Sequence, residues 1–266
     1  MGTKVFRAVV VFLLILLLVP PVQGQRSILH EISERGKIII AINTGVKPFT
    51  FRDDKGDPTG FCIDLNKLIG EKMGVEVEFV DLDWAGLLPA LLAGRVDMIG
   101  DRMSNTLERA KSVAFTDPYF RTGTIAYSRT DTPFTCWQDL NNPKVTVGAA
   151  LGAIGEVLAE EKLPLAQKAV FNTTAEMTEA LMAGRVDAAL EDDVLAVSES
   201  AKAPDKMHVL EGYLYVDTYA FTVRHENPEL LRWLNLFFEQ IKRSGEFEAI
   251  YEKWIGPWNP IPQKLL

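Results

Sequence analysis

Two groups of polar residues, well separated in the chain, have the chemistry to bind a small dipolar molecule. Residues 100–109, GDRMSNTLER, include the hydroxyl of Ser104 and the guanidinium of Arg109. Residues 191–193, EDD, are three consecutive acids. Guanidinium and hydroxyl groups suit a carboxylate, and carboxylates suit an ammonium, because hydrogen bonds between charged partners are the strong ones. The two groups together favour a solute that carries both a carboxylate and an ammonium.

Each polar group follows a copy of the same motif. ALLAGRVDMIGD occupies residues 90–101, and ALMAGRVDAALED occupies residues 180–192. In both copies an apolar turn ends at a glycine, Gly94 or Gly184, which can adopt the left-handed conformation that closes a helix. The apolar run after the Val-Asp pair is typical of a buried strand. Two copies are too few and too far apart for a solenoid with its period of ~20–50 residues, so the repeat predicts two similar α/β lobes.

The repeats also predict where a ligand would lie. In open parallel α/β sheets, ligands bind beyond the carboxyl ends of the strands. Both polar groups come directly after the strand of a repeat. We therefore expect one site in the gap between the lobes, with guanidinium and hydroxyl groups from the first lobe and carboxylates from the second.

The first unit is predicted to alternate helices and strands, from its hydrophobic periodicity and its turn residues. Its elements are a helix over 27–35, a strand over 37–43, a hairpin turn at 54–57, a helix over 62–73 and a strand over 75–82. Ser27 is the expected N-cap of the first of these helices. Pro89 belongs in the first turn of the next helix, because it cannot donate a backbone hydrogen bond from the middle of one.

The second unit follows the same pattern. Its elements are a strand over 145–150, a helix to about residue 161, a strand over 168–172, a helix that ends at Gly184, the repeat strand, a helix over 194–201 and a strand over 206–210. Thr173 and Glu176 have the spacing of a capping box. Extended segments at 124–130 and 219–225 cross between the units, and helices over 229–241 and 247–254 end the pattern.

Two crossings imply that the first lobe is discontinuous. The predicted division gives residues 25–123 with 221–266 to lobe 1 and residues 124–220 to lobe 2. Each lobe is expected to be a mostly parallel sheet flanked by helices. The predicted fold class is therefore α/β, a two-lobed hinged clamshell.

Composition sets the size of the protein and excludes some partners. The chain has 266 residues, 47% of them hydrophobic, and so exceeds the usual single-domain size of ~100–150 residues. Its formal net charge of -8 argues against a nucleic-acid backbone as partner, since that contact needs concentrated Lys and Arg. His30, His208 and His225 are scattered and form no recognisable triad or metal site, so neither a metal nor another cofactor is expected.

The N-terminus has the composition of a secretory signal. Lys4 and Arg7 come before an apolar run at 8–19, and the small-residue pattern that ends at Gly24 follows. The run is shorter than the ~20 residues that a membrane-spanning helix needs, and no cysteine follows it for lipid attachment. Residues 1–24 are therefore predicted to be a signal peptide, and the mature protein is expected to be soluble and periplasmic or otherwise extracytoplasmic.

The chain has two cysteines, Cys62 and Cys136, whose spacing fits no metal motif. An extracytoplasmic compartment permits a disulfide between them. The sequence does not settle whether their Cα atoms approach within the ~7 Å that a disulfide requires. Two buried thiols are the favoured alternative.

With these segments in view, the chain from about residue 29 to residue 257 resembles the amino-acid-type (type II, family 3) periplasmic solute-binding proteins of ABC transporters. The resemblance rests on KPFTFRDDKGDPTGFCIDL, DWAGLLPALLAGRVDMI, SNTLERAKSVAFTDPYF, VTVGAALGAIGE, DAALEDD and GEFEAIYEKWIG. The combination of SxTxxR with a following FxDPY is the most specific part. The resemblance implies the type II periplasmic-binding-protein clamshell.

The resemblance also implies roles for individual residues. Arg109 matches the arginine that clamps the ligand α-carboxylate, where a planar fork can donate two parallel bonds. Ser104 matches a hydroxyl position near the same carboxylate. Asp192 matches the acid that receives the α-ammonium, with Asp193 as the competing choice and the one expected to be more exposed. Trp84 matches an aromatic that stacks on the ligand side chain, although core packing is an equally good interpretation.

Other positions of the implied site depart from the family pattern. Ala153 and Ile154 stand where the family has two hydroxyl residues at a helix N-terminus, so the backbone N–H groups remain but the hydroxyls are lost. Asp101 and Arg102 replace small or hydroxylated residues, either as an ion pair that satisfies itself or as partners of a charged ligand group. Asn43, with Val46, stands where many relatives have an acid and an aromatic. The pocket is thus altered, and the sequence does not name the amino acid.

The expected function is binding without catalysis. The open lobes capture an amino acid or a similar small zwitterion or carboxylate, the hinge closes, and an ABC permease in the membrane recognises the closed form. The protein is expected to act as a monomer. A charge buried by closure costs several kcal/mol unless it finds a partner, which is the role expected of Arg109 and Asp192.

Two alternatives remain at this stage. Cyclohexadienyl (arogenate or prephenate) dehydratases resemble the same family and use a carboxylic acid in the cleft. Their catalytic glutamate aligns with Gly155 here; Glu156 is one residue away and would point elsewhere, because a helix turns by ~100° per residue. A ligand-binding domain of a sensor is the other alternative, but no membrane span or signalling module follows in the chain.

Overall fold

The structure is a computed structural model, and it describes residues 27–256. The predicted signal peptide, residues 1–24, lies outside the described residues. Among the residues that are described, no helix has the length and apolar character needed to cross a membrane.

One mixed sheet organises the described part of the chain. Along its main path the strands lie in the order β4 (Glu76–Asp81), β1 (Lys37–Ile42), β5 (Met98–Ser104), β12 (Tyr215–Val223), β7 (Phe120–Arg129), β10 (Ala188–Asp192), β8 (Thr146–Ala150) and β9 (Gln167–Phe171). β1 pairs in parallel with β4 and β5, and β8 pairs in parallel with β9 and β10. The pairings of β12 and β7 along this path are antiparallel. Each parallel group therefore forms one end of the sheet.

Short strands complete the pairing. β6 (Ala114–Phe115) lies beside β12, and β11 (Met207–Val209) lies beside β7. The predicted hairpin forms from β2 (Phe51–Arg52) and β3 (Pro58–Thr59) around the expected turn.

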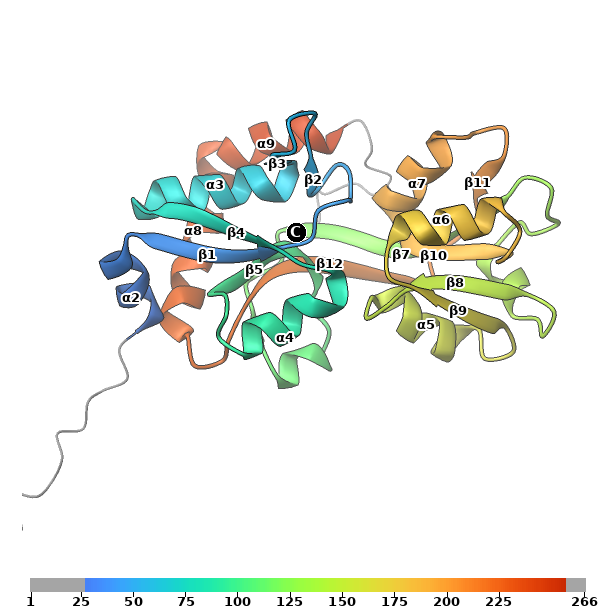
Figure 1. Ribbon diagram of the computed structural model, residues 1–266, viewed down its shortest axis with the longest axis horizontal. Coiled ribbons are helices and arrows are strands. Elements are labelled where there is room, and N and C mark those ends of the chain that lie inside the picture. The colour runs from blue at the N-terminus through green and yellow to red at the C-terminus, as the bar shows by residue number, and fades with distance from the viewer. Residues whose placement is uncertain (1–26, 257–266) are drawn as a thin grey trace, which may run out of the picture.

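The long strands β7 and β12 run side by side between two groups of elements (Figure 1). We call these groups the β1 half and the β8 half, after the central strand of each parallel group. Helices of the β1 half are α2 (Ile28–Arg35), α3 (Phe61–Met73), α4 (Leu87–Leu92), α8 (Pro228–Ser244) and α9 (Glu246–Trp254). Helices of the β8 half are α5 (Ile154–Lys162), α6 (Thr174–Met182) and α7 (Asp193–Ala201).

Each half has a hydrophobic core on both faces of the sheet. Along β1, Ile38 and Ile40 pack into a cluster with residues of α3 and α8, whereas Ala41 packs with residues of α4. Along β10, Leu190 and Ala189 likewise face different clusters. Successive side chains of a strand point to opposite faces, so a strand covered on both faces must be apolar throughout. The continuous apolar runs in the sequence have this cause.

The repeated motif has the same structure in both halves. Gly94 and Gly184 have φ angles of 68° and 71°, in the left-handed region predicted for them. The aspartate of the first copy, Asp97, donates its backbone N–H to Ile39 and accepts from the N–H of Ile39 through its side chain, at 2.8 and 2.7 Å. Asp187 makes the equivalent pair of bonds with Thr146, both at 2.8 Å. The motif thus joins each repeat strand to its parallel neighbour.

Several local predictions can be compared with the structure. Ser27 precedes α2 as expected but makes no side-chain cap bond. Thr173 does cap α6, accepting from the N–H of Glu176 at 3.1 Å, whereas the Glu176 carboxylate accepts from Asn172. The strands that cross between the halves, β7 and β12, begin several residues earlier than the segments predicted at 124–130 and 219–225.

Both cysteines are free thiols, the favoured alternative of the sequence analysis. Cys62 is buried, with its sulfur 3.6 Å from the Tyr119 hydroxyl, whereas Cys136 is only half-buried.

Candidate functional site

A cavity of about 220 Å³ lies where the β1 half and the β8 half meet. Its volume is below the ~300–1,000 Å³ typical of sites for drug-sized molecules, so it suits a small solute. The β1 half and the β8 half each contribute residues to its wall: Asn43, Thr44, Gly45, Val46, Asp83, Trp84, Arg102, Ser104, Ala150, Ala153, Ile154, Gly155, Asn172, Thr173, Thr174, Ala175, Leu190, Glu191 and Asp192. The carboxyl ends of β5, β8, β9 and β10 all open towards this cavity, as the rule for parallel sheets predicts.

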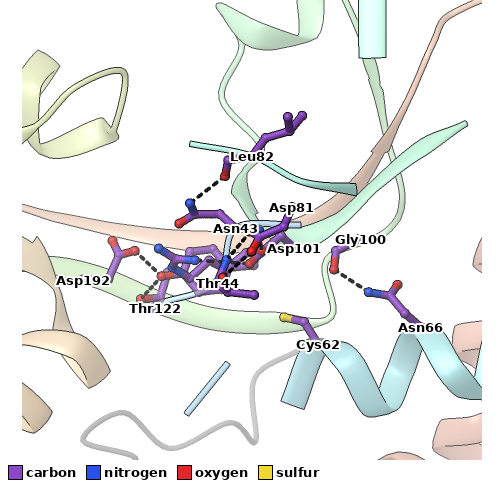
Figure 2. Close-up of polar contacts among 12 residues, drawn as sticks. Asn43, Thr44, Cys62, Asn66, Asp81, Leu82, Gly100, Asp101, Thr122 and Asp192 are labelled. Atoms are coloured by element: carbon purple, nitrogen blue, oxygen red, sulfur yellow. Dashed lines mark hydrogen bonds and ion pairs between the residues drawn. The ribbon is translucent and has the colours of Figure 1, made fainter. Parts of the chain in front are cut away.

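Asp101 and Arg102 form an ion pair at the end of β5. Asp101 is fully buried and lies outside the cavity lining; its Oδ1 is 3.2 Å from an Arg102 guanidinium nitrogen, and its Oδ2 accepts from the backbone N–H of Asn43 at 2.8 Å (Figure 2). Arg102 is also largely buried, but it lines the cavity. Burial alone would lower the pKa of Arg102, but the carboxylate of Asp101 raises it above the ordinary value, so the side chain is a cation.

Trp84 also contacts this arginine. The Arg102 guanidinium carbon is 4.7 Å from the centre of the Trp84 ring, within the range of a cation–π contact. The indole Nε1 donates to the carbonyl oxygen of Gly152 in the β8 half, at 3.4 Å. Trp84 thus lines the cavity while one of its faces is covered by a cation of the protein itself.

Arg109 lies beside the cavity rather than in its lining. Its guanidinium donates to the carbonyl of Ser104 at 3.0 Å and to the carbonyl of Gly152 at 2.9 Å. The first bond keeps the side chain next to Ser104, which does line the cavity, and the second reaches across to the β8 half. Burial lowers the pKa of Arg109, partly offset by the carboxylates of Asp217 and Asp192.

The acids of the β8 half occupy three different environments. Asp192 lines the cavity, and its Oδ2 accepts from the hydroxyl of Tyr219. Glu191 also lines it, but both of its oxygens accept hydrogen bonds, from the Thr174 hydroxyl at 2.8 Å and from the backbone N–H of Asp192 at 3.1 Å. Burial raises the pKa of both carboxyl groups, so a cation that enters the cavity would stabilise their charged forms.

The expectation that Asp193 is the more exposed acid is wrong. Its residue is only 1% exposed, and its Oδ1 accepts from the Thr122 hydroxyl at 3.0 Å. Asp193 begins α7, which turns its side chain away from the cavity and towards β7. Burial raises its pKa to about 6.

The N-terminus of α5 contributes backbone rather than hydroxyl groups. Ala153 is the residue before the helix, and it lines the cavity together with Ile154 and Gly155. The Glu156 carboxylate turns back to accept from the backbone N–H of Gly152 at 2.7 Å, and Glu156 is not among the residues that line the cavity. Gly155, the position aligned with the dehydratase glutamate, is therefore a glycine in the cavity wall. The neighbouring acid, Glu156, binds the backbone before its own helix instead of facing the cavity.

The cavity brings together most of the predicted site residues. Asn43, Trp84, Arg102, Ser104, Ala153, Ile154 and Asp192 line it, whereas Asp101 and Arg109 stand directly behind lining residues. The Asn43 side chain is oriented by its own bond, from the amide nitrogen to the carbonyl of Leu82 at 2.8 Å (Figure 2).

Some lining residues were missed by sequence reasoning. Thr173 and Thr174 were interpreted as the start of a helix, although they follow β9 and the rule for strand ends would have included them. Tyr219 does not line the cavity but contacts Asp192 from the middle of β12, and nothing in the local sequence connects the two residues. No role was predicted for Asp83, which precedes Trp84 and lines the cavity.

Comparison with known proteins identifies the family. Residues 38–257 match the model of the bacterial extracellular solute-binding proteins, family 3. The chain belongs to this family. The resemblance stated from the sequence motifs is thereby confirmed.

Solved structures confirm the fold. An ancestral amino acid-binding protein, described as a precursor of cyclohexadienyl dehydratase, is 36% identical with a TM-score of 0.80, over 86% of this chain and 99% of that chain. A mutant of ArgBP from T. maritima is 33% identical with a TM-score of 0.80, over the same shares of the two chains. The chain therefore has the mixed α/β, type II periplasmic-binding-protein fold.

Among curated proteins, the L-cystine-binding protein TcyJ of Escherichia coli (strain K12) is 26% identical over 235 residues, which are 88% of each chain. It is a binding protein, as the family description states, and the dehydratase enters the comparisons only through the ancestral precursor. The protein is accordingly a member of a family of solute-binding proteins. No cluster of His, Cys, Asp or Glu within residues 27–256 is arranged to hold a metal ion.

Proposed function

We propose that this protein captures an amino acid in the cavity between its two halves and delivers it to an ABC permease. The observation that carries the proposal is the charge distribution of the cavity. The β1 half brings the guanidinium groups of Arg102 and Arg109, and the β8 half brings the carboxylate of Asp192. A zwitterion placed between them has a partner for each charge, which a buried ion requires.

Two residues are assigned to the ends of the amino acid. Arg109, held next to Ser104 by the bond to its carbonyl, clamps the α-carboxylate with N–H groups that remain available. Asp192 accepts the α-ammonium through the oxygen that Tyr219 does not occupy. The relatives support an amino acid as solute, because their names specify L-cystine, arginine in the case of ArgBP, and amino acids in general.

The remaining positions of the site shape it around the solute. Trp84 and Asn43 form the wall on the β1 side, with Asp101 behind them as the anchor of Arg102. Ala153 and Ile154 form the wall on the β8 side. The N–H of Ala153 donates to the carbonyl of Ala150 at 3.1 Å, so the N–H of Ile154 is the one that replaces the lost hydroxyl groups at this helix N-terminus.

The chain divides into two lobes that close on the solute. In the predicted division, residues 25–123 with 221–266 belong to one lobe and residues 124–220 to the other, with β7 and β12 as the hinge; residues 25–26 and 257–266 lie outside the described residues. A solute shifts the balance between open and closed forms by its differential affinity for them. The closed form is the one that the permease recognises. Residues 1–24 act as the secretory signal that brings the protein, as a monomer, to the periplasm or cell exterior.

A binding screen tests the proposed function. The protein is unfolded, freed of bound solute, refolded and heated with each amino acid in turn; a solute that binds only the native state raises the melting temperature. We expect at least one amino acid to do so. Arg109→Ala should abolish that shift in a variant that still folds, although the loss of its two carbonyl bonds lowers its own melting temperature by a few degrees. Arg95→Ala, at an exposed arginine of the repeat motif, is the matched control. If no amino acid stabilises the protein, the proposed function is wrong.

A further inference from the structure

We propose that Arg102 receives a second carboxylate of the solute, so that the cavity selects dicarboxylic amino acids over their amides and over cationic amino acids. The inference rests on the proposed function, because it names the class of amino acid that the same cavity takes. It is carried by the position, anchoring and unused hydrogen-bonding capacity of this one side chain.

Arg102 is a cation built into the wall of the cavity. Its guanidinium is held by two contacts, an ion pair with the fully buried carboxylate of Asp101 and a cation–π contact with the ring of Trp84. Asp101 is in turn fixed by the backbone N–H of Asn43. A side chain held by two contacts is preorganised for a ligand, because little conformational entropy remains to be lost on binding.

Most N–H groups of the Arg102 guanidinium remain available as hydrogen-bond donors. It carries five N–H bonds, and among residues 27–256 it donates one side-chain hydrogen bond, to Asp101 at 3.2 Å. The side chain is 7% exposed, so the other donors have little bulk water to bind. A carboxylate is the group that matches this fork, since it can accept two parallel bonds from one guanidinium.

Arg102 already offsets part of the negative charge that a cationic solute side chain would need. Glu191 accepts hydrogen bonds from Thr174 and from the N–H of Asp192, and the charge of Arg102 acts on its pKa against the effect of burial. Asp192 has one oxygen occupied by Tyr219 and one that remains for the α-ammonium. Asp83, the other acid in the lining, is exposed at the rim.

A cationic side chain of the solute would meet the charge of Arg102 instead. Like charges repel strongly at short range in a partly buried site, because the effective dielectric constant there is well below that of water. The ring of Trp84, which could otherwise stack on a cation, already has Arg102 over it. The cavity therefore opposes a lysine or arginine side chain and favours an acidic one.

Isothermal titration calorimetry of the stripped and refolded protein tests this inference. The ligands are aspartate, glutamate, asparagine, glutamine, lysine and arginine. We expect one of the two acids to bind about tenfold or more tightly than its own amide and than either cationic amino acid, because the amide loses a charge-assisted pair. Arg102→Gln should abolish the preference of acid over amide, and Arg102→Lys should retain part of it because the charge is kept.

A second variant controls for the chance that Arg102→Gln fails to fold. Arg102→Gln leaves the buried carboxylate of Asp101 without its cation, so Asp101→Asn with Arg102→Gln is the second variant, and both should lose the preference. The inference is overturned if wild type binds lysine, arginine or an amide as tightly as the acids, or if the folded variants keep the preference. In either case, binding of some amino acid would still support the proposed function. If no amino acid binds, both the proposed function and this inference are wrong.

Discussion

Arg109 donates a hydrogen bond to the carbonyl oxygen of Gly152 at 2.9 Å, and this bond joins the two halves of the protein next to the cavity. The indole of Trp84 donates to the same oxygen at 3.4 Å. One backbone carbonyl of the β8 half is thus the meeting point of two side chains of the β1 half. A residue that binds the solute and also contacts the opposite half couples binding to closure, because the two contacts are made together.

Arg109→Lys tests the need for a planar fork at this point. We expect about a tenfold or greater loss of affinity for the best solute, because one ammonium cannot donate to Ser104, Gly152 and a carboxylate with the geometry of a guanidinium. Calorimetry of wild type and variant measures the change. Arg95→Lys is the control, and equal affinities of Arg109→Lys and wild type would contradict the prediction.

Asp192→Asn tests the partner of the ammonium. We expect affinity for the best solute to fall by about 10- to 100-fold, since the charged hydrogen bond becomes a neutral one. The fold should persist because an amide oxygen can still accept from Tyr219. The control is Asp193→Asn, at a neighbouring acid that does not line the cavity, and its affinity should stay within about threefold of wild type. A variant of Asp192 that binds like wild type would remove this acid from the site.

The sequence was sufficient to predict the fold because each half obeys local rules. The helix stop at Gly94 and its counterpart Gly184 required only the left-handed conformation that glycine adopts, and the strands after them were apolar because both faces of the sheet are covered. The lengths of β7 and β12 were underestimated. Their extra residues pair with each other between the two halves, and a pairing of strands distant in sequence leaves no local signal.

The candidate site was predictable in part for the same reason. Arg102 and Asp192 lie near the carboxyl ends of β5 and β10, and the rule for strand ends places both near the cavity. The orientation of their side chains was not predictable. Arg102 faces the cavity and Asp101 faces the protein interior because of contacts with Trp84 and Asn43, which come from other parts of the chain. Alternation along a strand separates the two faces without saying which one the solute meets.

The buried carboxyl group of Asp193 predicts a pH dependence of stability. Burial raises its pKa from 3.8 to about 6. A raised pKa means that the folded state favours the protonated form, so this contribution is fully present below about pH 4 and is lost as the pH rises through about 6. The shift of roughly two pKa units corresponds to about 3 kcal/mol of unfolding free energy.

Denaturant unfolding of wild type and Asp193→Asn between pH 4 and pH 7.5 isolates this contribution. The other titrating groups are common to both proteins, so the difference in unfolding free energy reports on this one carboxyl group. We expect the stability of the variant to rise relative to wild type by about 2–3 kcal/mol across that range. A difference that stays constant with pH would show that Asp193 titrates alike in the folded and unfolded states.

Two arginines hold the repeat turns in equivalent ways. Arg224, just after β12, donates through one guanidinium nitrogen to the carbonyls of Leu91 and Val96 at 3.0 and 2.8 Å. Arg129, at the end of β7, does the same in the other half, with both carbonyl bonds at 2.9 Å. The internal repeat therefore includes a partner from each crossing strand, although neither arginine belongs to the repeated motif.

Replacing either arginine by alanine should destabilise the protein. Two carbonyls around a helix end lose the arginine as a donor in each variant, although Leu91 still accepts from the N–H of Gly94 and Leu181 from that of Gly184. We therefore expect Arg224→Ala and Arg129→Ala each to lower the unfolding free energy by about 1–3 kcal/mol. The arginines of the motif itself are the controls: Arg95 and Arg185 are exposed, and their alanine variants should change it by less than ~0.5 kcal/mol. Because the two turns lie in different halves and share no partner, the losses should add in the double variant. Denaturant unfolding measures wild type and the five variants. An equal cost at Arg95 and Arg224 would mean that charge on the surface, rather than the bonds to the turn, determines the effect.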